Sequence, residues 1–326
     1  MKGDQIRVKP CICESHIVHC MSFSWNFLCA TLCELHRHGA ETGKRSCSLI
    51  ALMILGVTWL VASGEIDVSF PNIAAFASIM TAYCIKIGVP WSLTIFIAPI
   101  SAIPFGILSA VLINTFNFPA LIATIADASV ATSVARIFNN GQPLYLAQSS
   151  DFVEFIVYGK LFGIFPVLFL IVLALFLFVQ WLQNNTTIGQ HLYALGENRR
   201  AALEAGISEK RIIMNIFVLS ALLAGVSGVL LAASFSSGQP RIGGSFFIDG
   251  LTAVFLGSLV IKFGRPNVLG SLFGAVIIAT LSNGITILGI PFYAGTIAKG
   301  LSMVLCVGVM VWQRSKLANT SASRAG

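Results

Sequence analysis

The segment NNTTIGQHLYALGENRRAALEAGISEKR (184–211), which we call the polar island, separates two long apolar runs. One run covers residues 161–182 and the other covers residues 212–233. A helix needs roughly 20 apolar residues to cross a bilayer, and each run has about that length. The sequence therefore predicts two membrane-spanning helices joined by a polar loop.

The island contains its own secondary-structure signal. Residues 198–205 (NRRAALEA) have the composition of a short helix. Gly206 follows directly, and glycine is suited to the left-handed position after a helix end. We therefore expect one short helix on one face of the membrane, where it can contact another molecule.

Composition places the whole chain in the same class. Hydrophobic residues make up 56% of the sequence and charged residues 10%, whereas soluble domains have about 25% charged residues. The apolar runs are continuous rather than alternating, which indicates helices rather than a barrel. The predicted fold is an all-α polytopic membrane protein with nine or ten transmembrane helices, some of them short or broken, and one short helix in the polar island. The nine expected spans are 49–62, 73–89, 91–113, 119–137, 161–182, 212–233, 248–261, 268–290 and 291–313.

Two segments within this pattern are unusual. The stretch SGEIDVSFPN (63–72) contains the helix breakers Gly64 and Pro71 and two acidic residues that are costly in lipid. It is either a loop at a membrane face or a helix break inside the protein. The span 119–137 is rich in small residues, which allow close packing, so we expect it to be buried among other helices.

Residues 1–48 differ from the rest of the chain. They hold six of the eight cysteines and four of the five histidines. Three interpretations apply: a weak span at 17–33, a metal site, or a mistranslated segment. The third is favoured, because the spacing of the candidate metal ligands does not match structural zinc sites. Those ligands are Cys11, Cys13, His16, His19 and Cys20.

The distribution of basic residues predicts the orientation. The island has four basic residues, the turn KFGRPN (262–267) has two and the polar tail 314–326 has three, whereas the loops 138–160 and 234–245 have one each. The positive-inside rule then places the island, the turn and the C-terminus in the cytoplasm. The net charge of +7 reflects these loops, so nucleic-acid binding is not expected.

Four motifs carry a resemblance to a known family. They are SGEIDVSF (63–70), FNFPALIATIA (116–126) with NNGQP (139–143), YALGENRRAALEAGI (193–207), and the block 251–290 that ends in NGITILGI. Together they resemble the permease subunit of bacterial ATP-binding-cassette (ABC) importers, in the branch that takes up ribose, other monosaccharides and autoinducer-2. The resemblance covers residues 49–313, so we expect an atypical N-terminus (1–48), a permease domain (49–313) and a polar tail (314–326).

The resemblance implies a function and a set of partners. The chain would form the translocation path of an ATP-driven sugar or autoinducer-2-like importer in the bacterial inner membrane. No G-x-x-x-x-G-K-[ST] motif occurs in the sequence, so the chain is not expected to be an enzyme or to hold a cofactor of its own. ATP would bind a separate ATP-binding-cassette subunit. The other implied partners are a second permease copy or paralogue, a periplasmic sugar-binding protein and the lipid bilayer.

The resemblance also implies that the short island helix is a cytoplasmic coupling helix, which contacts the ATPase. Small residues there permit close approach, and its charged residues can form ion pairs that fix the register of docking. The alternative is a solvated connector with ordinary surface charges. The expected coupling residues are Asn198, Arg199, Ala201, Ala202, Glu204, Gly206 and Ile207.

Polar groups within the spans are candidates for the translocation path, because ionisable residues in a membrane are often functional. The candidates are Asp67, Asp127, Asn283 and Thr286. Structural roles are the alternative and are favoured for each, since polar contacts between helices are common. Asp127 would then pair with Arg136 or Thr124, and Asn283 would bond a neighbouring helix.

Two other functions remain open. An ion-driven secondary transporter would place carboxylates or basic groups near the middle of the membrane, and Asp127 is the one clear candidate in the sequence. A permease damaged at its N-terminus would be an inactive relative of the importer subunit.

Overall fold

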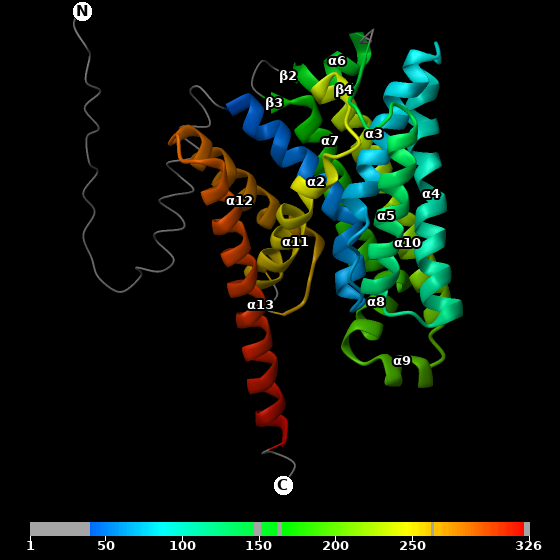
Figure 1. Cartoon of the computed structure of the whole chain (residues 1–326). Helices are drawn as coiled ribbons and strands as arrows, with labels where there is room; N and C mark the ends of the chain where they lie inside the picture. Colours follow the sequence, from blue (N-terminus) through cyan, green and yellow to red (C-terminus); the bar gives the residue numbers. More distant parts are fainter. Residues whose placement is uncertain (1–39, 147–150, 162–164, 262–263, 323–326) are drawn as a thin grey trace, which may run out of the picture.

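The structure is a computed structural model that describes residues 40–146, 151–161, 165–261 and 264–322. Over these ranges the chain is almost entirely helical (Figure 1). The helices are α2 (Ala40–Ala62), α3 (Phe70–Lys86), α4 (Trp91–Phe116), α5 (Ala120–Ile137), α6 (Asp151–Tyr158), α7 (Val167–Asn185), α8 (Thr187–Glu197), α9 (Arg199–Glu204), α10 (Glu209–Phe235), α11 (Gly243–Val260), α12 (Val268–Ile287) and α13 (Phe292–Ala322). The two-residue strands are β1 (Leu144–Tyr145), β2 (Lys160–Leu161), β3 (Phe165–Pro166) and β4 (Ser237–Gly238).

Long apolar helices make up the membrane part of the fold. Within the described ranges six helices, α4, α5, α7, α10, α11 and α12, are long and apolar enough to span a membrane. Shorter apolar stretches lie in α2 (Cys47–Ala62) and α13 (Tyr293–Val309). Together with α3, a helix occupies each of the nine expected spans, which confirms the predicted all-α membrane fold.

Several boundaries differ from the expectations. Helix α2 begins at residue 40, inside the segment predicted to be atypical. Helix α11 begins at residue 243, so it is longer than the span expected at 248–261. Helix α13 continues to residue 322, through most of the expected polar tail. The metal ligands considered at positions 11–20 lie outside the described residues.

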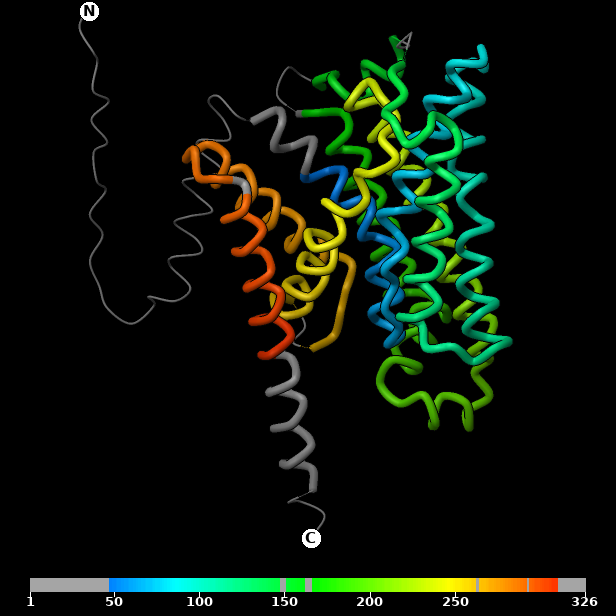
Figure 2. The backbone as a smooth tube through the Cα atoms, in the orientation of Figure 1, coloured from blue at the N-terminus to red at the C-terminus, as the bar shows by residue number. Residues whose placement is uncertain are grey.

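The helices form two groups (Figure 2). In the first group α10 packs on α2, α3 and α4, while α5 covers α3 and α4. In the second group α11 packs on both α12 and α13, and α11 and α12 also contact α2. Helix α2 therefore belongs to both groups.

Glycines allow the closest helix contacts in each group. A Cβ atom at Gly106 on α4 would lie 2.6 Å from the carbonyl oxygen of Phe217 on α10. A Cβ atom at Gly257 on α11 would lie 2.3 Å from backbone atoms of Gly270 on α12. These backbones touch directly, as is common where small residues line the contact between membrane helices.

The expected burial of the small-residue span 119–137 applies to only one face of α5, where Ala123, Ala128, Ala131 and Ala135 are buried. Helix α5 lies on the outside of the first group (Figure 1), and its side chains Ile122 and Ile125 are 58% and 49% exposed. The exposed surface of α5 also carries the small or polar residues Ala126, Ser129 and Ser133. Small residues permit close packing, but they do not decide which neighbour does the packing.

The two ends of the bundle differ. Helix α9 lies beyond the ends of α4 and α5, and α8 lies beside those ends (Figure 1); we call this the island end. At the other end β1 pairs antiparallel with β4, and α6 and the β2–β3 pair lie close by; we call this the ribbon end. The connection 138–160, expected as a polar loop, contains β1 and α6.

Candidate functional site

The short helix predicted in the island is confirmed as α9, and local chemistry explains both its ends. Asn198 adopts an extended backbone conformation before the helix, and its side-chain oxygen accepts a hydrogen bond from the Ala201 amide at 3.1 Å. This is the usual N-cap arrangement. Gly206 follows the helix with φ at +83°, a conformation that favours glycine.

Helix α8 was not predicted. It carries the buried residues Gly189, Leu192 and Leu195, and their spacing gives one apolar face. Because this apolar face is short and the segment is rich in Thr, Gln and Gly, it reads as a polar loop in the sequence. In the structure α8 packs on α2, α7 and α10, with Leu192 and Leu195 in the core.

The structure divides the expected coupling residues by exposure. Ala202 is buried at 4% exposure, and Ile207 packs against the core. Ala201 and Glu204 are exposed. Leu203, which sequence reasoning missed, is 49% exposed on the same helix. A lone leucine among exposed polar positions is the signal that could have identified it.

Arg199 joins three segments at the base of α9. Its Nη1 donates to Glu65 Oε1 at 3.0 Å, and its Nη2 donates to Glu209 Oε1. The hydrogen bond to Glu209 and the charges of both carboxylates raise the pKa of Arg199 above its ordinary value. The Arg199 side chain is 53% exposed and that of Glu65 is 11% exposed, so Arg199 ties α9 to the turn before α3 and to the start of α10.

The turn 63–69, expected as a loop at a membrane face or as a helix break inside the protein, is a largely buried break between α2 and α3 that lies beside α8 and α9. Asp67, which is 2% exposed, accepts hydrogen bonds from the Ser69 amide at 2.7 Å and from the Ser69 hydroxyl at 2.6 Å. The Ser220 hydroxyl of α10 also donates to Asp67, at 3.3 Å. The carboxylate therefore satisfies the broken backbone and attaches the turn to α10.

The path candidate Asp127 lies in the same group of helices. It is fully buried in α5, and its Oδ2 accepts a hydrogen bond from Ser109 of α4 at 2.9 Å. Its Oδ1 has no hydrogen-bond partner. Thr124, one turn earlier, accepts from the Val68 amide at 3.2 Å and so links α5 to the turn 63–69. The structure thus brings Asp67 and Asp127 to one side of the molecule.

The other two path candidates belong to the second group. Asn283 and Thr286 lie near the end of α12. Asn283 is half-buried and Thr286 is exposed, and the Thr286 hydroxyl donates to the Ser282 carbonyl at 2.9 Å. The four candidates do not form one cluster, since two lie with α4 and α5 and two lie on α12.

A charged pair within the membrane helices was missed by sequence reasoning. Lys299 Nζ of α13 lies 2.8 Å from Asp249 Oδ1 and 2.9 Å from Asp249 Oδ2 on α11. The two side chains are 17% and 11% exposed. Each charge interrupts an apolar segment, and two such interruptions in separate spans are the signal that could have suggested a pair.

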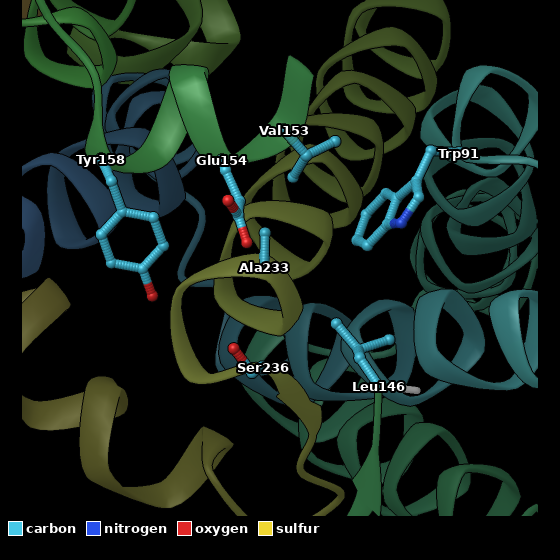
Figure 3. A pocket seen from close by; sticks show the side chains of 7 residues that line it. All are labelled: Trp91, Leu146, Val153, Glu154, Tyr158, Ala233 and Ser236. Atoms are coloured by element: carbon cyan, nitrogen blue, oxygen red, sulfur yellow. The ribbon is translucent and has the colours of Figure 1, made fainter. Parts of the chain in front are cut away.

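A small cavity of about 160 Å³ lies at the ribbon end (Figure 3). In this view the rings of Trp91 and Tyr158 lie on opposite sides, with the carboxylate of Glu154 between them. A second cavity of about 340 Å³ has apolar walls and shares Val153 and Ala233 with the first. The pair of cavities lies between α4, α6 and α10, away from α9.

Comparison with known proteins identifies the family. Residues 40–312 match the family described as branched-chain amino acid transport system / permease component. The chain is 30% identical over 263 residues to the ribose import permease protein of Bacillus subtilis, with 81% of each chain covered. It is 28% identical over 260 residues to the L-arabinose transport system permease protein of Escherichia coli, covering 80% of this chain and 78% of that one.

A third relative, the galactofuranose transporter permease protein of Escherichia coli, is 31% identical over 267 residues, covering 81% of this chain and 77% of the relative. No solved structure matches the chain. The family match covers most of the described residues, and the helices have the expected membrane-spanning character. The chain therefore belongs to the permease family of ABC importers, as a multi-pass membrane subunit.

Proposed function

We propose that this chain is the membrane permease subunit of an ATP-driven importer of a monosaccharide or a similar polar molecule, and that α9 is its contact with the ATPase subunit. The names of its relatives, which import ribose, L-arabinose and galactofuranose, support the substrate class. ATP would be bound by the partner, so this chain needs no cofactor of its own.

The observation that carries the proposal is the position of α9. It is a capped helix that extends beyond the bundle at the island end (Figure 1). Ala201, Leu203 and Glu204 are exposed on it, so an apolar side chain and a charge are available to a groove on a partner. Buried apolar anchors with a charged rim are typical of protein interfaces.

We place the translocation path along the exposed surface of α5, where a second permease copy or a paralogue would face it. Ala126, Ser129 and Ser133 interrupt an apolar membrane surface there, and hydroxyl groups suit a polar solute better than they suit lipid. Asp67, Asp127, Asn283 and Thr286 remain path candidates. The two aspartates would take part when α5 moves, because both are buried in this structure.

The proposed setting is the bacterial inner membrane, with the island end and the C-terminus in the cytoplasm and a periplasmic sugar-binding protein at the ribbon end. The basic residues of the island and of the turn 262–267 support this orientation.

Co-purification of the chain with its ATPase subunit tests the proposal. Leu203→Asp and Glu204→Arg are expected to reduce recovery of the ATPase at least about tenfold, because both alter the exposed surface of a small contact. Tyr145→Asp, at an exposed position of the ribbon end, is the matched control and should retain it. Full recovery with both α9 variants would remove α9 from the contact.

Uptake into proteoliposomes separates the two transport classes. An ABC importer takes up labelled sugar only with ATP and the binding protein. Uptake that survives without ATP and stops when the proton gradient is collapsed would instead identify a secondary transporter. A chain that binds the ATPase and the binding protein yet transports none of the tested pentoses and hexoses would contradict the proposed substrate class.

A further inference from the structure

A partly buried hydrogen-bonded chain connects the island to the second group of helices. Gln183, in the last turn of α7, is 2% exposed. Its Nε2 donates to Tyr193 Oη of α8 at 2.6 Å, and Tyr193 Oη donates to the Pro266 carbonyl at 2.9 Å. Gln183 Oε1 accepts from the Val268 amide at 3.2 Å. Two side chains thus join α7, α8 and the first residue of α12.

Neighbouring contacts strengthen the same connection. Gln180 Oε1 accepts from the Leu269 amide at 3.2 Å. Glu197 at the end of α8 forms an ion pair with Arg265 at 2.6 Å on the surface. Amides at a helix start have no partners within their own helix. The α7 glutamines supply partners for two such amides, so the start of α12 is bound to the helix that leads into the island.

The chemistry of Tyr193 suits a fixed connection. Burial raises the pKa of the Tyr193 hydroxyl to about 12, so the group remains protonated and able to donate to Pro266 at physiological pH. A Cβ atom at Gly189 would lie 2.0 Å from the Gln183 carbonyl oxygen, so α8 packs directly against the backbone of α7. Movement of α8 against α12 therefore has to change these hydrogen bonds.

Helix α8 is continuous with α9 except for the cap residue Asn198. On the other side, α12 packs along α11, which holds α13 through the Asp249–Lys299 pair. Arg199 links α9 to the first group of helices, whereas Gln183 and Tyr193 link α8 to the second. The island thus has a separate polar connection to each group.

We propose that Gln183 and Tyr193 are positioning residues for transport: they pass displacement of α8 and α9 to α12 and hence to α11 and α13. The inference rests on the proposed docking of the ATPase at α9. Neither residue is assigned to the ATPase contact, since Gln183 is buried and the Tyr193 hydroxyl bonds inward. Coupling in such a network is a difference in free energy between two arrangements of the helices.

The test uses the whole importer, with ATPase subunits and binding protein, in proteoliposomes. Tyr193→Phe removes the hydroxyl and keeps the ring, and Gln183→Leu removes the amide at similar volume. We expect both variants to retain the ATPase subunit and basal ATP hydrolysis. The amount of sugar taken up per ATP hydrolysed should fall about tenfold, because loss of a buried hydrogen-bond partner changes an equilibrium by about that factor.

The matched controls are Gln190→Leu, at an exposed position of α8, and Tyr158→Phe, which loses a hydrogen bond to the Ser234 carbonyl at the ribbon end. Both should keep the normal ratio of uptake to hydrolysis. A ratio within twofold of wild type in Tyr193→Phe and Gln183→Leu would overturn the inference. Loss of the ATPase from both variants would overturn it too, because the residues would then serve assembly.

A surface variant covers the case in which the buried variants fold poorly. Glu197→Arg places like charges beside Arg265, and Glu197→Arg with Arg265→Glu restores an ion pair. The single variant should lower the uptake ratio and the double variant should recover it. Equal ratios in the two would count against the connection. Failure of the wild-type chain to bind any ATPase subunit would instead contradict the proposed function, which makes the two failures distinguishable.

Discussion

Arg199 shows how one side chain can serve two purposes in a short helix. Half of its side chain is exposed, but its guanidinium is held by Glu65 and Glu209 from other segments. Sequence reasoning placed Arg199 in the contact with the ATPase. The structure adds an internal role, because a nearly buried carboxylate needs a cationic partner.

Replacing Arg199 by Ala is expected to lower the free energy of unfolding by about 1–3 kcal/mol, since it leaves the Glu65 carboxylate without its partner. The double variant Glu65→Ala with Arg199→Ala should lose less than the sum of the two single variants. Thermal unfolding in detergent measures this difference. Arg200→Ala, at the exposed neighbouring position, is the control and should change little. Additive losses would show that the two residues do not interact.

The Asp249–Lys299 pair allows a similar experiment inside the membrane. Lys299→Met leaves a buried carboxylate unpaired and should destabilise the protein by about 3 kcal/mol. Asp249→Asn with Lys299→Met removes both charges and should be closer to wild type than Lys299→Met alone. Melting curves of the purified variants decide this, with Lys86→Met, an exposed lysine at the end of α3, as the control. A double variant less stable than Lys299→Met would refute the pairing.

At the scale of whole elements, the helices show which features of the fold a hydropathy pattern predicts. Each of the nine expected spans was found because a run of apolar residues must become a helix in lipid, where the backbone has no other partner for its hydrogen bonds. The hydropathy pattern does not show which helices pack against one another. Helix α5 was expected inside the bundle and lies on its surface, and α8 was not expected at all.

Gly257 tests the close contact between two elements. Its missing side chain lets α11 and α12 touch backbone to backbone. Gly257→Leu should force these helices apart and lower the melting temperature by several degrees, because an overpacked helix contact costs about 1–3 kcal/mol. Gly300→Leu on α13 has nothing within 4 Å of the added Cβ atom and serves as the control. Equal melting temperatures for the two variants would contradict the close approach.

At the scale of the whole molecule, the island and the turn 264–267 lie together at one end of the helix bundle, and the ribbon end lies at the other. The Tyr193 hydroxyl of α8 donates to the Pro266 carbonyl, and Arg265 forms an ion pair with Glu197 of α8. These two contacts place the turn at the island end. The island and the turn are far apart in the sequence, and the sequence analysis assigned them to the same face only by counting their basic residues. The structure brings them together through direct contacts.

Cysteine labelling in intact cells tests the orientation. In a background without native cysteines, Gln190→Cys in α8 is expected to resist a membrane-impermeant maleimide added outside and to react after the cells are opened. Tyr145→Cys at the ribbon end should react from the periplasm. These outcomes follow from the positive-inside distribution. The reverse pattern would invert the topology and would exclude ATPase docking at α9 from the cytoplasm.

The sequence by itself determined the membrane class, the nine spans and the short capped helix after Asn198. The length of an apolar run and the residues that cap a helix are local properties, so a single stretch of sequence is enough to show them. Only the tertiary structure decided that Asp249 meets Lys299, that Arg199 holds Glu65, and that Gln183 and Tyr193 reach α12. These contacts join residues from 10 to 134 positions apart. Which buried polar groups become partners depends on the packing of helices, and no local pattern records it.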